Sequence, residues 1–136
     1  MSARNLNIAL WTAQVLLALV FGAAGFMKVT MPLSDLAGML TWPGNVPSWL
    51  VRFIGTAELA GAIGVLLPAF TRIRPMLTPL AALGFAIIQI LAVPVHISQG
   101  DIATVGPINA ILLALALFVV WGRYAKLPIQ PKGALA

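Results

Sequence analysis

Four long apolar stretches constrain this chain more than any other feature. A transmembrane helix needs about 20 mostly apolar residues to cross roughly 30 Å of hydrocarbon. In a chain of 136 residues, such stretches run over about residues 6–29, 50–67, 77–97 and 106–122, and the second one ends at Pro68. We therefore expect an all-α membrane protein, in which residues 1–136 form a single domain built as a bundle of four transmembrane helices.

The composition excludes the usual soluble alternatives. Apolar residues make up 61% of the chain and charged residues only 8%, whereas a soluble domain carries about 25% charged residues. The basic residues are too scattered for a nucleic-acid-binding face, so we expect no nucleic-acid partner. The chain has no cysteine, which excludes disulfides, thiolate metal sites and thiol redox chemistry within it.

The basic residues predict how the helices are oriented in the membrane. If all four stretches cross, six cations fall on one side: Arg4, Arg72, Arg74, Arg123, Lys126 and Lys132. The positive-inside rule places this side, and with it both termini, in the cytoplasm. We expect an integral protein of a bacterial cytoplasmic membrane. The alternative, that residues 6–29 are a signal peptide, is less consistent with their length, because a signal core has about 7–15 apolar residues.

The remaining segments are shorter and more polar. Residues 30–49 contain three prolines and are therefore not one continuous helix. Ser34 can cap a short helix through Leu40, which would lie flat on the outer leaflet or fold over the bundle as a short outer amphipathic segment. Residues 123–136 are predicted to form a cytoplasmic tail that is loosely held after Lys126.

Polar side chains inside a membrane are costly, so each one is a candidate for function. Glu58 is the deepest acid, roughly 12 Å along the helix from Leu50. Gln89 and His96 are seven residues apart and share a helix face. The other polar residues near the outer helix ends are Lys28, Arg52 and Asn109. The polar atoms therefore gather in the outer half of the bundle, and the inner half holds only Gln14.

We interpret these residues as an outward-facing polar pocket. Glu58 and Lys28 would form a charge pair, and His96 is the third candidate catalytic residue, because carboxylate and imidazole groups can move protons. The candidate cofactor-binding residues around them are Arg52, Gln89 and Asn109. Such a pocket suits the polar head of a small amphiphile, for example a quinone or a lipid-like molecule, and the residues leave the choice of cofactor open.

Each candidate also has a structural interpretation. The Glu58–Lys28 pair can fix the register of two helices, and Lys28 can instead extend to the headgroups. Arg52 can anchor the interface, His96 can be a solvated residue at a helix end, and the two amides can hydrogen-bond between helices. One histidine and three acids are too few for a histidine-rich metal site, so we predict no metal site.

Several short motifs resemble the DoxX-like family of small four-helix integral membrane proteins. Residues 24–28 read Ala-Gly-Phe-Met-Lys and are similar to its small-Gly-x-x-Lys segment. Residues 55–61 read Gly-Thr-Ala-Glu-Leu-Ala-Gly and are similar to its Gly-x-x-Glu-Leu-x-Gly segment. The third stretch begins with Pro-Leu-Ala-Ala and reaches His96, as in the family. The resemblance covers roughly residues 6–124 and implies that Lys28, Glu58 and His96 are the family's polar positions.

The resemblance also implies a redox context, because the family is named from a subunit associated with thiosulfate:quinone oxidation. The leading hypothesis is a component of a membrane redox system that binds a small amphiphile or quinone, with redox-complex subunits as partners. The first alternative is a membrane-embedded enzyme that uses Glu58 or His96 on an apolar substrate such as an isoprenoid or epoxide. The second is a small transporter with Glu58 as its coupling residue. Stripes of small residues on several helices also predict a homo-oligomer.

Overall fold

The computed structural model describes residues 1–40 and 42–133, and every regular element in this part of the chain is helical. The α-helices are α1 (Ala3–Thr30), α2 (Leu33–Leu40), α3 (Ser48–Thr71), α4 (Leu77–Gln99) and α5 (Ile102–Trp121). A short 3-10 turn, η1 (Trp42–Asn45), precedes α3, and a π-helical turn, η2 (Gly122–Lys126), continues α5. The expected all-α architecture is confirmed.

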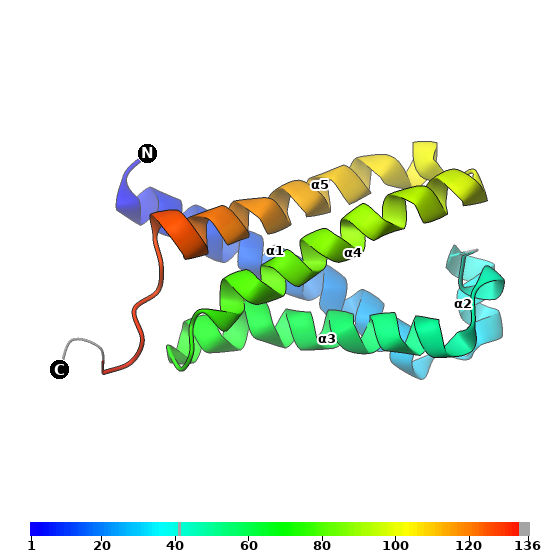
Figure 1. The fold of residues 1–136 in the computed structure, drawn as a ribbon, viewed down its shortest axis with the longest axis horizontal. Coiled ribbons are helices and arrows are strands. Elements are labelled where there is room, and N and C mark those ends of the chain that lie inside the picture. Colours follow the sequence, from blue (N-terminus) through cyan, green and yellow to red (C-terminus); the bar gives the residue numbers. More distant parts are fainter. Residues whose placement is uncertain (41, 134–136) are drawn as a thin grey trace.

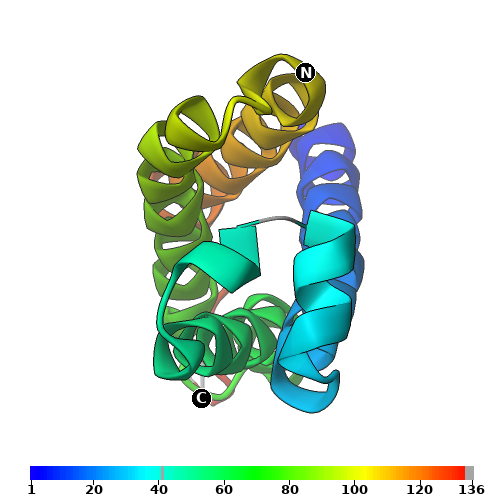
Figure 2. The same ribbon diagram turned by 90° about the vertical axis from the view of Figure 1, so that its right-hand side faces the viewer.

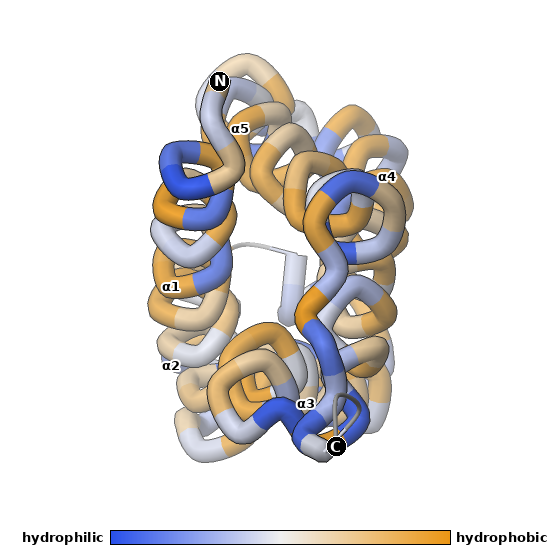
Figure 3. The backbone as a smooth tube through the Cα atoms, turned by 90° about the vertical axis from the view of Figure 1, so that its left-hand side faces the viewer, coloured by the Kyte–Doolittle hydropathy of each residue, from blue (hydrophilic) through white to orange (hydrophobic). Residues whose placement is uncertain are grey.

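Four of these helices are long and apolar enough to cross a membrane: α1, α3, α4, and α5 together with η2. The N-terminus and the last part of the chain that the structure describes lie at one end of the bundle, which we call the terminal end (Figure 1). The short α2 and η1 lie across the opposite end, which we call the pocket end (Figure 2). Hydrophilic residues gather near the chain ends, whereas the long helices are mostly hydrophobic (Figure 3). The chain is therefore an integral membrane protein of four spanning helices.

The core lies between the four long helices. Phe21 of α1 and Phe85 of α4 stack with their ring centroids 4.0 Å apart and their planes only 7° from parallel. Val65 of α3 and Ala116 of α5 are fully buried beside them. Large apolar side chains on the outer faces, such as Phe70, are exposed, as expected where lipid replaces water.

Two glycines set the closest approach of α1 to α3. A Cβ atom on Gly25 would lie 2.7 Å from the carbonyl oxygen of Gly55, and one on Gly55 would lie 2.6 Å from Cβ of Lys28. Contacts this short leave no room for a side chain at either position, so small residues are needed here for the helices to pack. This contact brings Lys28 onto the face of α3 that carries Glu58.

The second spanning helix does not end at Pro68, as the sequence predicts, but continues to Thr71. Proline lacks the N–H that would donate to the carbonyl oxygen of Gly64. The hydroxyl of Thr78, on α4, donates to this oxygen instead, at 3.2 Å. Because the carbonyl left free by Pro68 finds a partner on the next helix, the helix can run on for another turn.

The other boundaries differ by less. Ser2 caps α1, since its side chain accepts a hydrogen bond from the backbone N–H of Asn5, so α1 begins at Ala3 rather than at residue 6. The fourth spanning helix begins at Ile102 rather than at residue 106. Gly100 adopts a φ of 79°, which allows the tight turn between α4 and α5.

The predicted tail is held more closely than the sequence suggests. Its first residues continue α5 as η2, and Arg123 is only 3% exposed. Further along, Arg72 at the end of α3 donates to the carbonyl oxygen of Gln130, and the backbone N–H of Lys132 donates to the carbonyl oxygen of Arg72. These bonds hold the segment against the α3–α4 turn.

Candidate functional site

The pocket end contains a buried ion pair between α1 and α3. The Nζ atom of Lys28 lies 3.0 Å from Oε2 and 3.2 Å from Oε1 of Glu58. Lys28 is 7% exposed and Glu58 4% exposed. An ammonium group has three donors, so binding both carboxylate oxygens leaves one N–H of Lys28 for another partner.

A second polar pair joins α4 to α5. The side-chain amide of Gln89 donates to Oδ1 of Asn109 at 2.8 Å, and the amide of Asn109 donates to the backbone carbonyl of Gln89 at 3.1 Å. Both residues are buried. The Oε1 atom of Gln89 accepts no hydrogen bond within the described residues, so it is available as an acceptor.

His96 lies near the end of α4, where its Nδ1 atom is 2.9 Å from Oδ1 of Asp101. Asp101 is not among the site residues predicted from the sequence. A signal was present, because the two residues are five apart across the turn that Gly100 makes possible. With Nδ1 directed to the carboxylate, Nε2 is the nitrogen left for a further contact.

A cavity of about 480 Å³ brings these groups together. Its polar lining residues are Lys28, Glu58, Gln89, His96 and Asn109, which we call the polar cluster. The other lining residues are Trp42, Leu50, Phe53, Ile54, Ala57, Ile87, Ile88, Leu91, Ala92 and Val95. Five of the six sequence-predicted site residues thus line one cavity.

The apolar side of the cavity reaches the outer surface of the bundle between α3 and α4. Phe53 of α3 is 64% exposed and Leu91 of α4 is 63% exposed, although both line the cavity. At the pocket end, Trp42 of η1 stands over the cavity with its ring centroid 5.9 Å from Nζ of Lys28. The cavity therefore combines a buried polar interior with an apolar opening toward lipid.

Arg52, the sixth predicted site residue, does not line the cavity. Its Nη1 atom donates to the backbone carbonyls of Lys28, at 2.9 Å, and Met31, at 2.8 Å. These carbonyls belong to the end of α1, where helix carbonyl groups have no partner within the helix. Arg52 therefore holds the end of α1 in place, and its effect on the cavity is indirect.

A further group of polar contacts, of which the sequence indicated only Gln14, lies toward the terminal end. The Nε atom of Arg123 donates to Oε1 of Gln14 at 2.8 Å, and the amide of Gln14 donates to the carbonyl oxygen of Val65 at 2.7 Å. The guanidinium group lies 5.6 Å from the ring of Trp11. This chain of bonds links α1, α3 and the end of α5.

The arrangement of the polar cluster limits its chemistry. Glu58 bonds to Lys28 and His96 bonds to Asp101, so the two candidate acid–base groups are held by separate partners. Within residues 1–40 and 42–133, no three His, Cys, Asp or Glu residues are grouped as a metal site would require. The cluster is suited to hydrogen bonding with a ligand of no net charge, because Lys28 and Glu58 already neutralise each other.

Comparisons with known proteins place this arrangement in a family context. A family model with the description DoxX-like family matches residues 12–119, from the first turns of α1 to near the end of α5. The matched range includes every residue of the polar cluster. Comparisons with curated proteins and with solved structures give no match.

Proposed function

The chain belongs to the DoxX-like family, and from this premise we propose that it binds a small uncharged amphiphile, such as a quinone, in the cavity between α3 and α4. The observation that carries the proposal is the buried polar cluster at the inner end of a cavity whose apolar walls reach the lipid-facing surface. Ligand sites are commonly apolar cavities with a few convergent polar groups. A polar head would lie at the cluster and an apolar tail would leave between Phe53 and Leu91.

The charge of the cavity favours a neutral head. The two oxygens of Glu58 share one ammonium group, and the neighbouring cation, Arg52, is bonded to backbone carbonyls instead. An anionic headgroup would therefore meet a buried carboxylate without a second cation to offset it. Burying an unpaired charge is costly, so the cavity should discriminate against anionic lipids.

The unused hydrogen-bonding groups match both redox states of a quinone. The third N–H of Lys28 can donate to a quinone carbonyl, and Oε1 of Gln89 can accept from a quinol hydroxyl. Stacking against Trp42 would add to the binding of a flat ring. We propose that the chain acts in a membrane redox system through this quinone site, with the pocket end facing away from the cytoplasm because the six cations lie at the terminal end.

The alternatives receive less support from the geometry. An acid–base enzyme needs its groups aimed at common substrate atoms, and Glu58 and His96 are each bonded elsewhere. A transporter needs a path toward the terminal end, where the stacked rings of Phe21 and Phe85 and the buried Leu17 form a close-packed core.

Binding can be tested with ubiquinone-1 and the protein's own tryptophans. Quinones quench indole fluorescence at short range, so we expect saturable quenching by ubiquinone-1 of the protein in nanodiscs. Trp42→Phe should remove most of the saturable signal, because Trp42 lines the cavity. Trp121→Phe is the matched control, since Trp121 lies at the other end of the bundle and is 48% exposed, and it should leave the saturable signal in place.

A pair of substitutions on α3 tests the location independently. Ala57 lines the cavity, whereas Ala60, three residues on, is exposed and lies outside it. Ala57→Leu should weaken ubiquinone-1 binding at least about tenfold, or about 1.4 kcal/mol, and Ala60→Leu should not. Quenching that never saturates and is equal in all these variants would mean simple partition into the bilayer and would refute the proposal.

A further inference from the structure

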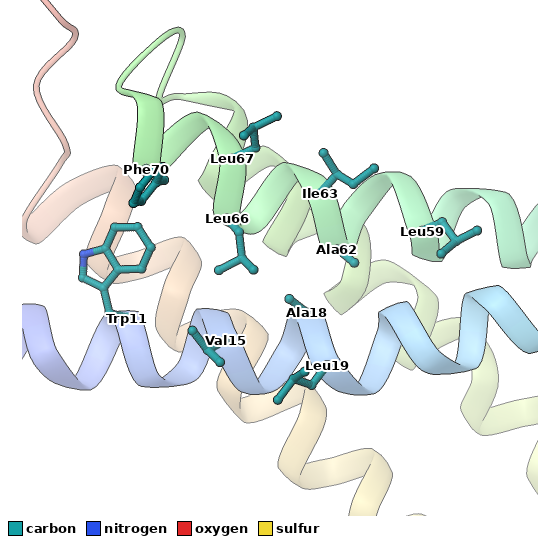
Figure 4. Close-up of a pocket in the computed structure, with 10 residues that line it drawn as sticks. All are labelled: Trp11, Val15, Ala18, Leu19, Leu59, Ala62, Ile63, Leu66, Leu67 and Phe70. Atoms are coloured by element: carbon teal, nitrogen blue, oxygen red, sulfur yellow. The ribbon is translucent and has the colours of Figure 1, made fainter.

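A second hollow lies on the side of the bundle formed by α1 and α3. It encloses about 830 Å³ and is lined by apolar side chains. Val15 and Ala18 of α1 face Ala62 and Leu66 of α3 across it, and Trp11 faces Phe70 at its terminal end (Figure 4). We call this hollow the α1/α3 groove.

The groove follows from the way the two helices touch. Their backbones meet at Gly25 and Gly55 near the pocket end, and helices that pack at an angle separate on either side of the contact. The small side chains of Ala18 and Ala62 do not fill the widening space. The groove is therefore a consequence of the angle at which α1 and α3 pack.

The length of the groove matches one leaflet of a bilayer. Along α1 it runs from Trp11 to Leu19, roughly 12 Å, and along α3 from Leu59 to Phe70, roughly 17 Å. Half of a hydrocarbon core is about 15 Å thick. A lipid acyl chain lying along the groove would thus reach from the interface to the middle of the membrane.

The end of the bundle toward which the groove widens carries most of the positive charge. All three acidic side chains of the protein, Asp35, Glu58 and Asp101, lie on the pocket-end side, whereas six Lys and Arg residues lie toward the terminal end. Arg4 is exposed and lies two helical turns before Trp11, so both are on the same face of α1. A ligand that meets this end therefore meets uncompensated positive charge.

Arg123 adds a further cation, which lies behind Trp11. Its side chain is buried against Trp11, and its Nη2 atom is buried without a hydrogen-bond partner in the described part of the chain. A buried cation without a counter-charge is costly. The indole nitrogen of Trp11 points toward the terminal end (Figure 4), where it can donate to an anion that Arg4 on the same face of α1 attracts.

We propose that the α1/α3 groove binds one anionic phospholipid, with an acyl chain between Ala18 and Ala62 and the phosphate at the end marked by Trp11, Arg4 and Arg123. The acyl chain contributes apolar contact, and the phosphate supplies the negative charge that this end lacks. The site differs from the cavity between α3 and α4, which is neutral and takes an uncharged head. The proposed lipid binding does not depend on the proposed quinone binding.

The test is lipid retention, measured by native mass spectrometry of protein released from nanodiscs of equal phosphatidylglycerol and phosphatidylcholine. We expect one phosphatidylglycerol per chain to be retained in preference to phosphatidylcholine. Arg4→Gln should lower this retention about fivefold, or about 1 kcal/mol, the contribution of one cation near an anionic surface. Lys132→Gln is the charge-matched control on the tail and should change retention less than about twofold.

The predicted contact with the acyl chain is tested separately by two matched substitutions on α1. Ala18→Leu fills the groove and should reduce retention, whereas Ala23→Leu, at an exposed position outside the groove, should not. Equal retention of the two lipids, or no effect of Ala18→Leu, would overturn the proposal. Displacement of the lipid by free glycerol 3-phosphate would also overturn it, because this would show a phosphate site without an acyl chain. A dimer that Ala18→Leu dissociates would overturn it as well, because a second copy would then occupy the groove.

Discussion

Replacing both members of the Lys28–Glu58 pair is expected to restore the stability that either single replacement removes, without restoring ligand binding. The perturbation is a double-mutant cycle of Lys28→Met, Glu58→Met and the double variant. Methionine approximates the length of both side chains and adapts to irregular space. The cycle separates a charge pair that holds two helices together from one that contacts a ligand.

The magnitude follows from the burial of the pair. Two unit charges 3.0 Å apart attract by about 5–6 kcal/mol at an effective dielectric constant of about 20, and this attraction offsets the desolvation of both groups. Removing one partner leaves the other charge buried and alone, which costs about 3–5 kcal/mol. Replacing both with apolar residues removes the attraction together with the desolvation, and such replacements are often neutral or stabilising by about 1–4 kcal/mol.

Two readouts on the same four proteins complete the experiment. Unfolding in mixed micelles, followed by circular dichroism, should show two destabilised single variants and a double variant at least as stable as the parent. Ubiquinone-1 quenching should be lost in all three variants, because each lacks a polar group of the cavity. A double variant that binds ubiquinone-1 as the parent does would show that the pair is purely structural. If the double variant lost as much stability as the two single variants combined, the assumption that each buried charge is stabilised mainly by the other would be refuted.

Two further substitutions test the helix packing, with expression level and thermal unfolding in detergent as the measurements. Gly25→Ala should destabilise the protein by about 1–3 kcal/mol through overpacking, because its Cβ would lie 2.7 Å from the backbone of α3. Gly84→Ala should be tolerated, because a Cβ at this position would meet no other packed group of the described residues within 4 Å. Equal behaviour of the two variants would refute the close contact of α1 with α3. Thr78→Val should cost about 1–3 kcal/mol by leaving the Gly64 carbonyl without a donor. Adding Pro68→Ala should recover part of this loss, since alanine at this position supplies the N–H that proline lacks, and no recovery would mean that the threonine hydroxyl acts elsewhere.

The sequence could predict that the polar side chains gather at one end of the bundle, because the position of a residue along a helix follows from its number alone. At about 1.5 Å per residue, the spacing alone places Lys28, Glu58, Gln89, His96 and Asn109 in the same half of the bundle. Their shared membership of one cavity was then a reasonable expectation, and all five line it. Arg52 lies in the same half, but its long side chain reaches backbone carbonyls that no sequence pattern identifies.

The long apolar stretches by themselves determined that this protein is helical and embedded in a membrane. In hydrocarbon a helix must satisfy its backbone hydrogen bonds within itself, so hydropathy and length predict each span with little help from its neighbours. Helix ends were less predictable, because the partner that lets α3 continue past Pro68 is Thr78 on another helix.

Only the tertiary structure decided which faces meet and which polar groups become partners. Gln14 and Arg123 are 109 residues apart, and nothing in their separate helices indicates that one will bond to the other. The same holds for the α1/α3 groove, which exists because two glycines let the backbones touch at one point and separate beyond it. Crossing geometry depends on the fit of all four helices at once, so it arises only when they are packed together.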